Sequence, residues 1–201
     1  MRHIIYIATS LDGYIADAQD KLDWLFAVPN PEQDDMGFAS FMQRVDAVVM
    51  GRKTFDTVCA FDGEWPYDKP VFVLSRTMTE LPEKTAGKAV YPVQGEIDAV
   101  LAGIHRAGYH NLYIDGGTAA KQCLAADLID EMVITTVPVL LGGGTPLFGS
   151  LPSPLQFVHI STEQYFNYMV KNTWYRSVIR LRKPDYTAGA PVQTPFHGNP
   201  D

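Results

Sequence analysis

The chain has 201 residues, of which 46% are hydrophobic and 19% are charged, and its formal net charge is −7 at pH 7. This length suits one domain with a sizeable core, and the composition is that of a globular protein rather than a disordered chain or a disulfide scaffold. The negative charge disfavours a general nucleic-acid or anionic-membrane surface, which would need clustered Lys and Arg, although it leaves room for a local basic pocket.

The amino-terminal segment predicts a buried strand over His3 to Thr9, because it is rich in Ile and ends at polar residues. The apolar run from Met1 to Ser10 is too short for a signal-peptide core or a membrane span, so we expect a cytoplasmic protein. The next loop, Ser10 to Trp24, combines several Asp residues with apolar anchors. A loop of this length and composition is typical of a functional lid.

Two carboxylates, Asp34 and Asp35, precede a stretch with helical apolar spacing. Asp34 is the predicted N-cap of this helix. At three and seven residues before Phe38 and Met42, Asp35 would share their buried face, where desolvation raises a carboxyl pKa toward the range useful for proton transfer. In the alternative interpretation, the helix starts one residue later and Asp35 only caps it.

Two further predicted strands each end at polar and cationic residues. The strand Ala47 to Met50 leads into Gly51, Arg52, Lys53 and Thr54. The strand Val71 to Leu74 leads into Ser75 and Arg76. Two cations beside a helix start oppose the helix dipole, which an anionic ligand would explain; a solvated Arg-Lys pair is the alternative.

A pair of glycines follows the predicted strand Asn111 to Ile114. Gly116, Gly117 and Thr118 lead into a helix predicted over Ala119 to Ala126. Unpaired N–H groups at such a helix start favour a phosphate, whereas a tight turn that binds nothing is the alternative. Three strand ends with this chemistry together favour a dinucleotide, and the cations among them favour NADP(H) over NAD(H).

The order of the elements indicates an α/β fold with a mainly parallel sheet covered by helices on both faces. The clearest helix is predicted over Ile97 to Ala107. After it the helices give way to strands, predicted over Glu131 to Leu141, Gln156 to Thr162 and Trp174 to Leu181. The last two are expected to be antiparallel, at the edge of the sheet.

Glycine and proline mark two segments as irregular. Gly142 to Thr145 is predicted to be a flexible turn, because prolines follow it instead of a helix; the rim of a pocket is the second interpretation. Residues 184–201 are rich in Pro, Gly, Ala and Thr and have little apolar content to bury. We therefore expect one domain over residues 1–183 and a flexible tail over residues 184–201.

The residue types that commonly hold metals lack a suitable spacing. Cys59 and Cys123 lie far apart and are expected to be reduced thiols without a catalytic role. The five His residues, at positions 3, 105, 110, 159 and 197, form no paired ligand spacing. The Asp residues of the first loop do not match an EF-hand. No metal is predicted.

Four motifs in this order resemble the dihydrofolate reductase superfamily, and within it the branch similar to the reductase domain of bacterial riboflavin biosynthesis. The motifs are Ser10-Leu11-Asp12-Gly13-Tyr14-Ile15-Ala16, Val49-Met50-Gly51-Arg52-Lys53-Thr54-Phe55, Val73-Leu74-Ser75-Arg76 and Ile114-Asp115-Gly116-Gly117-Thr118. The resemblance covers roughly Met1 to Arg182, so it extends over the predicted domain. It implies a dihydrofolate reductase-like fold. The His-x-Glu and Pro-Cys-x-x-Cys motifs of the zinc deaminases that are often fused to riboflavin reductases do not occur in this sequence.

The resemblance also implies an NADPH site and assigns residues to it. By this resemblance, the residues that line the nicotinamide region are Ala8 and Ile15. Those that hold the adenosine-side phosphates are Gly51, Arg52, Lys53 and Thr54, and those that surround the adenine ribose are Leu74, Ser75 and Arg76. The diphosphate would be bound by Asp115, Gly116, Gly117, Thr118 and Ala119. The residues that would face the substrate are Trp24 and Thr135.

These expectations combine into an NADPH-dependent oxidoreductase that transfers a hydride to a small heterocyclic substrate of the 5-amino-6-(5-phosphoribosylamino)uracil type. Asp35 or a bound water is expected to supply the proton. Asp35 lies sixteen residues before Gly51, the separation of the substrate-binding carboxylate and the corresponding glycine in some dihydrofolate reductases. Dihydrofolate reductase activity is therefore one alternative, and a non-catalytic dinucleotide-binding regulatory protein is the other. Since members of this branch often pair through sheet edges, a homodimer is expected.

Overall fold

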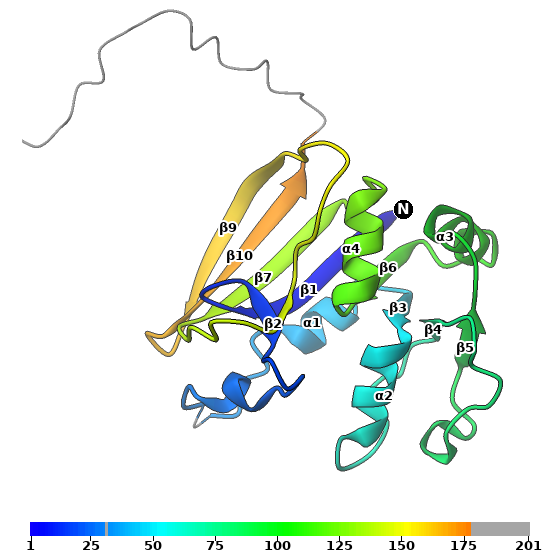
Figure 1. Cartoon of the computed structure of the whole chain (residues 1–201), viewed down its shortest axis with the longest axis horizontal. Helices are drawn as coiled ribbons and strands as arrows, with labels where there is room; N and C mark the ends of the chain where they lie inside the picture. Colours follow the sequence, from blue (N-terminus) through cyan, green and yellow to red (C-terminus); the bar gives the residue numbers. More distant parts are fainter. Residues whose placement is uncertain (31, 178–201) are drawn as a thin grey trace, which may run out of the picture.

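The structure, a computed structural model, describes residues 1–30 and 32–177. Its centre is an eight-stranded sheet with the order β5-β4-β3-β6-β1-β7-β10-β9 (Figure 1). The strands of this sheet are β1 (Arg2–Ser10), β3 (Ala47–Gly51), β4 (Val71–Leu74), β5 (Val90–Val93), β6 (Asn111–Asp115), β7 (Glu131–Val137), β9 (Phe157–Tyr165) and β10 (Met169–Arg176). A small second sheet pairs β2 (Tyr14–Ala16) with β8 (Thr145–Pro146).

The sheet is parallel from β5 to β7, and β10 and β9 join it antiparallel. Strand β3 is buried at every residue, as expected for a parallel strand that is covered on both faces. Strand β9 is exposed along most of its length, as expected for the edge. The predicted mainly parallel sheet with an antiparallel carboxyl-terminal edge is therefore confirmed.

Helices cover both faces of the sheet (Figure 1). The helices are α1 (Phe38–Met42), α2 (Arg52–Ala60), α3 (Ile97–Arg106) and α4 (Gly117–Ala125), with 3₁₀ turns η1 (Asp23–Phe26) and η2 (Glu83–Thr85). The apolar sides of α3 and α4 pack on one face, with Ile5 of β1, and those of α1 and α2 pack on the other, with Ile4. This division follows from the alternation of side chains along a strand. Within the described part of the chain, no helix is long and apolar enough to cross a membrane.

Most elements predicted from apolar runs are confirmed. The first four predicted strands correspond to β1, β3, β4 and β6, each within one residue at either end, and the clearest predicted helix is α3. Helix α4 begins two residues before the predicted start, so Gly117 and Thr118 lie inside its first turn. Strand β5 was not predicted, because Pro92 interrupts a half-exposed four-residue run.

Three predicted strands have wrong ends, and one of them, β9, extends to Tyr165 instead of Thr162. Strand β7 stops at Val137 instead of Leu141, because Pro138 cannot donate to the sheet ladder. Strand β10 begins at Met169 instead of Trp174, after a hairpin turn in which Phe166 and Asn167 have φ of 55° and 58°. The end of that predicted strand, residues 178–181, and the predicted tail, residues 184–201, lie outside the described residues.

Candidate active site

The carboxyl ends of three neighbouring strands meet at one edge of the sheet. Strand β3 lies between β4 and β6, and its register places Met50 beside Asp115 and Gly51 beside Leu74. Parallel strands that run side by side end at the same edge, which is where α/β sheets bind their ligands. The three sequence motifs that follow these strands are therefore brought close together.

Glycine allows two of these motifs to touch. The φ of Gly116 is +79°, and a Cβ added there would lie 1.9 Å from Oγ1 of Thr54. A Cβ added at Gly51 would lie 3.2 Å from Cβ of Thr118. At Gly116 the positive φ and the overlap with Thr54 leave no room for a larger residue. At Gly51 a larger residue would have to displace the side chain of Thr118.

A cavity of about 370 Å³, termed cavity A, opens over these strand ends. Residues of β1, β2, α2, α4 and β8 contribute to its walls. The predicted cofactor residues that line it are Ala8, Ile15, Lys53, Thr54, Asp115, Gly116, Gly117 and Thr118. The volume lies within the range of small-molecule sites.

The start of α4 offers free backbone donors to cavity A. The first i→i−4 bond of this helix runs from the N–H of Ala120 to the carbonyl of Gly116, at 3.0 Å. The N–H groups of Gly117, Thr118 and Ala119 come before that bond, so the helix itself does not satisfy them. Such a helix start, with glycines that keep side chains out of the way, suits the diphosphate of a dinucleotide.

The predicted cations are placed differently from one another. Lys53 lines cavity A, where its ammonium donates to Oδ1 of Asp20 at 2.5 Å; the hydroxyl of Thr145 reaches the same oxygen at 3.1 Å. Arg52 does not line this cavity and instead forms an ion pair with Asp56, one helical turn away. That spacing of four residues was a signal in the sequence for a pair on the helix surface.

The third strand-end motif does not reach cavity A. Leu74, Ser75 and Arg76 follow β4 but are not among the residues that line the cavity. The hydroxyl of Ser75 instead accepts the backbone N–H of Met78 at 3.0 Å, which closes a local turn. Arg76 is exposed. A role for these residues around an adenine ribose remains a prediction.

Asp115 is a partly buried carboxylate that lines cavity A. The hydroxyl of Tyr67 donates to its Oδ2 at 2.8 Å, and Tyr113 also contacts it. Burial raises the pKa of Asp115, although the hydrogen bonds from the two tyrosines oppose this shift. Tyr67 was not predicted from the sequence, because it lies in the irregular segment between α2 and β4, where no periodicity marks it.

A second cavity of about 540 Å³, termed cavity B, lies over β1 and β7 and under the segment that contains η1 and the start of α1. Apolar residues form most of its walls, including Leu25, Val28 and Met169. Cavities A and B share wall residues, which are Tyr6, Ile7, Ala8, Leu25 and Phe38. The two cavities therefore adjoin at Tyr6, Ile7 and Ala8 of β1.

The two residues expected to face a substrate have different positions. Thr135 of β7 lines cavity B. Trp24 does not line either cavity; only 7% of it is exposed, and it packs with Val28, Val137 and Met169. A contact between Trp24 and a substrate therefore stays a prediction, whereas the adjacent Leu25 lines both cavities.

The structure corrects the predicted start of α1 and the environment of Asp35. The helix begins at Phe38, after Gly37 with a φ of 87°, so Asp34 is not its N-cap. Asp35 is exposed at the rim of cavity B, and its carboxylate accepts the N–H groups of Gly37 and Ala39, each at 2.8 Å. These bonds lower the pKa of Asp35 instead of raising it. The alternative interpretation, a capping role for Asp35, is closer to the structure.

Comparisons with known proteins agree with this architecture. The sequence model of the family described as RibD C-terminal domain matches residues 3–170. The uncharacterized protein YwjB of Bacillus subtilis (strain 168) is 33% identical over 164 residues, which are 81% of this chain and 91% of YwjB. The crystal structure of a candidate riboflavin biosynthesis protein from Shewanella sp. PV-4 is 52% identical and superposes with a TM-score of 0.85, covering 88% of this chain and 99% of that chain.

Two more distant structures show the fold alone. A diaminohydroxyphosphoribosylaminopyrimidine deaminase/5-amino-6-(5-phosphoribosylamino)uracil reductase of Thermotoga maritima is 15% identical, with a TM-score of 0.64 over 88% of this chain and 56% of that chain. Dihydrofolate reductase of Enterococcus faecalis, complexed with NADP(H), is 18% identical, with a TM-score of 0.60 over 87% of this chain and 96% of that chain. The predicted dihydrofolate reductase-like fold is confirmed.

Proposed function

This chain belongs to the RibD C-terminal domain family, and from that premise we propose that it is an NADPH-dependent reductase of a small heterocyclic substrate. The observation that carries the proposal is the meeting of cavities A and B over Tyr6, Ile7 and Ala8 of β1. A dinucleotide in one cavity and a heterocycle in the other would adjoin only there, and holding two reactants in contact is the main contribution that such a protein makes.

Cavity A is the proposed cofactor site. A reduced nicotinamide dinucleotide bound there supplies the hydride for the reduction. The free N–H groups at the start of α4 bind its diphosphate, and Gly116 and Gly117 let the backbone approach it. Lys53 offers a cation for a phosphate, and Ala8 and Ile15 form the apolar wall next to the nicotinamide.

Cavity B is the proposed substrate site. Its apolar walls suit a flat ring, while the hydroxyl of Thr135 and the carboxylate of Asp35 supply polar contacts. The proposed substrate is of the 5-amino-6-(5-phosphoribosylamino)uracil type, with a carbon–nitrogen double bond in its reactive form. Reduction adds a hydride to the carbon and a proton to the nitrogen, so the protein must also deliver a proton.

Asp115 is the better proposed proton donor of the two carboxylates. Burial raises its pKa, and it lines cavity A, which meets the proposed substrate cavity at Tyr6, Ile7 and Ala8; Asp115 does not line cavity B itself. Asp35 is exposed and is held in its ionised form by two backbone N–H groups. A general acid has to carry a proton before the reaction, which favours the carboxyl group with the raised pKa.

Replacing Lys53 by Ala is expected to raise the Kd for NADPH about tenfold and the Kd for NADH less than about threefold, because a charged hydrogen bond to the additional phosphate of NADPH is lost. Calorimetric titration with both dinucleotides measures the two constants. Arg52→Ala is the matched control, since Arg52 pairs with Asp56 and does not line cavity A. Equal losses for NADPH and NADH would contradict the proposed role of Lys53.

The position of Asp35 at the rim of cavity B favours a second candidate, dihydrofolate reductase activity. Turnover of dihydrofolate that Asp35→Asn abolishes, with no turnover of ribosylaminopyrimidines, would select this candidate over the first. If NADPH binds but no member of a broad panel of substrates is reduced, the chain is instead a dinucleotide-binding regulatory protein.

We also propose that the protein is a cytoplasmic homodimer. Among residues 1–30 and 32–177, strand β9 is one of the two edge strands of the sheet, and its Val158 and Ile160 are 49% and 48% exposed. An edge strand with apolar side chains is a suitable place for a second copy to pair. Light scattering after size-exclusion chromatography should give twice the mass of the chain, and Ile160→Lys should shift the mass to that of a monomer.

A further inference from the structure

A cation, Lys171 of β10, is buried beside cavity B. Only 8% of its side chain is exposed. Removing an ammonium from water is costly unless hydrogen bonds replace the water around it. A buried Lys therefore needs a structural or functional reason, and its partners show which of the two applies.

The partners of Lys171 use all three of its N–H groups. The Nζ atom lies 2.9 Å from the carbonyl oxygen of Met36, 2.8 Å from the hydroxyl of Tyr165 and 3.2 Å from Oε2 of Glu163. An ammonium has three donors, so none remains for a ligand. Lys171 is consequently held within the protein, and its charge is balanced there by Glu163.

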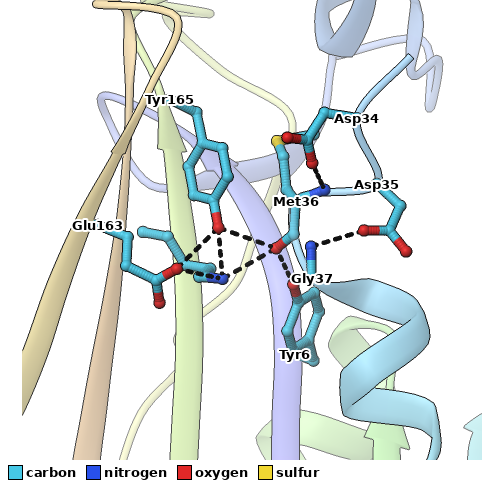
Figure 2. A network of polar contacts seen from close by, with 8 residues as sticks. Tyr6, Asp34, Asp35, Met36, Gly37, Glu163 and Tyr165 are labelled. Atoms are coloured by element: carbon cyan, nitrogen blue, oxygen red, sulfur yellow. Dashed lines mark hydrogen bonds and ion pairs between the residues drawn. The ribbon is translucent and has the colours of Figure 1, made fainter. Parts of the chain in front are cut away.

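The carbonyl of Met36 is the point where these contacts meet. Figure 2 shows Tyr6 and Tyr165 pointing toward this oxygen from different strands. The hydroxyl of Tyr6 donates to it at 2.8 Å, so that Tyr6 and Lys171 together occupy both lone pairs of the carbonyl. The hydroxyl of Tyr165 lies closer to Glu163, at 2.8 Å, and its single hydrogen is directed there.

The sheet register places Lys171 in the row of residues that forms the floor of cavity B. Ala8 of β1 is beside Thr135 of β7, Thr135 is beside Lys171, and Lys171 is beside Glu163 of β9. Neighbours in such a row project from the same face of the sheet. Ala8 and Thr135 line cavity B, so Lys171 stands at the next position outward, next to the cavity rather than in it.

The turn that Lys171 holds has a backbone that needs support. Met36 has a φ of 53° and Gly37 a φ of 87°. A left-handed conformation is unfavourable for a residue other than glycine, unless surrounding contacts enforce it. This turn also carries Asp35, Met36 and Phe38, which line cavity B. The position of the turn consequently decides the shape of that cavity.

We propose that Lys171 is a positioning residue for the substrate site: its hydrogen bond to the Met36 carbonyl fixes the turn over residues 35–38 on the sheet and so shapes cavity B. The proposal rests on the proposed function, because it takes cavity B as the substrate site. Glu163 and Tyr165 act through Lys171 by neutralising and orienting its ammonium. Of the turn residues, Asp35 and Met36 line only cavity B and Phe38 lines both cavities, so the contact acts mainly on the substrate cavity.

The test compares the wild type with Lys171→Met, which keeps an unbranched side chain one atom shorter and removes its donors. Amide hydrogen exchange over residues 35–39 is expected to become about tenfold faster, since opening of a segment follows the loss of its contacts. With a ribosylaminopyrimidine as the substrate, KM is expected to rise about tenfold while the Kd for NADPH changes less than about twofold. Tyr165→Phe, a milder change, should shift both properties in the same direction.

Arg176→Met is the matched control, because Arg176 is a cation of the same strand whose ion pair with Asp127 lies away from both cavities. It should leave the exchange over residues 35–39 and the KM unchanged. Unchanged exchange over residues 35–39 in Lys171→Met, or exchange that accelerates equally in β3, would overturn the proposal. If the wild type reduces no ribosylaminopyrimidine, the proposed function fails, whereas the exchange measurement still decides whether Lys171 positions the turn.

Discussion

Replacing Asp115 by Asn is expected to lower kcat at neutral pH by about 100-fold or more, a larger factor than any change in the Kd for NADPH, whose proposed cavity Asp115 also lines. Asn has nearly the same shape and can accept the hydrogen bond from Tyr67, but it cannot release a proton to a substrate. The measurement is steady-state oxidation of NADPH with a ribosylaminopyrimidine, together with a calorimetric titration of the cofactor.

The pH dependence of this reaction follows from the raised pKa of Asp115. The donor must be protonated, so kcat is present below the pKa of Asp115 and is lost as the pH rises through it. This loss at higher pH should be absent from the residual activity of Asp115→Asn. Tyr67→Phe removes a hydrogen bond that lowers the pKa of Asp115, and should therefore move the loss of kcat to higher pH.

Asp35→Asn is the comparison that separates the two carboxylates. It should lower kcat much less than Asp115→Asn does. The N–H groups of Gly37 and Ala39 stabilise the ionised form of Asp35, which has no proton to donate. A greater loss of kcat in Asp35→Asn than in Asp115→Asn would reverse the assignment of the proton donor and would favour the folate-directed activity.

Replacing Gly117 by Val is expected to raise the Kd for NADPH by about 100-fold or more, because the new side chain enters cavity A at the helix start that binds the diphosphate. A Cβ at this position would lie 2.7 Å from Cδ1 of Ile15 and 3.7 Å from Cγ2 of Thr145. Ile15 and Thr145 also line cavity A, so the larger side chain at position 117 reduces the space between the start of α4 and these two residues. Calorimetric titration measures the loss of binding.

A helical glycine outside the cavity provides the control. Gly103 of α3 has only the guanidinium of Arg106 near the position of an added Cβ, at 3.7 Å. Gly103→Val should therefore leave the Kd for NADPH unchanged. Both variants should be folded by circular dichroism, since neither glycine has a left-handed backbone. Tight binding of NADPH by folded Gly117→Val would mean that the cofactor does not occupy the start of α4.

The sequence predicted those parts of the fold that depend on local patterns. Buried parallel strands are short apolar runs that end at Gly, Ser or Asp, which is why β3, β4 and β6 were predicted within a residue of their ends. Because parallel strands end at one edge, the same runs also predicted a dinucleotide site built from three strand ends. The edge strand β5 lacked such a run and was missed.

Long-range contacts decided what local patterns could not. Helix α1 starts at Phe38, after a turn whose Met36 carbonyl accepts hydrogen bonds from Tyr6 and from Lys171, a residue 135 positions away. No periodicity around Asp35 records that contact, so the sequence alone left open whether Asp35 is buried with a raised pKa or only caps the helix. The partner of Lys53, Asp20, comes from the first loop, and its presence depends on how that loop folds back over cavity A.

The most direct test of the account is a calorimetric titration of the wild-type protein with NADPH and with NADH in parallel. The account predicts that NADPH binds at least about tenfold more tightly than NADH, because Lys53 offers a cation to the additional phosphate. It also predicts that Gly117→Val abolishes the heat of binding. Absence of binding by either dinucleotide would contradict the account and would leave the chain with the fold of a reductase but not its function.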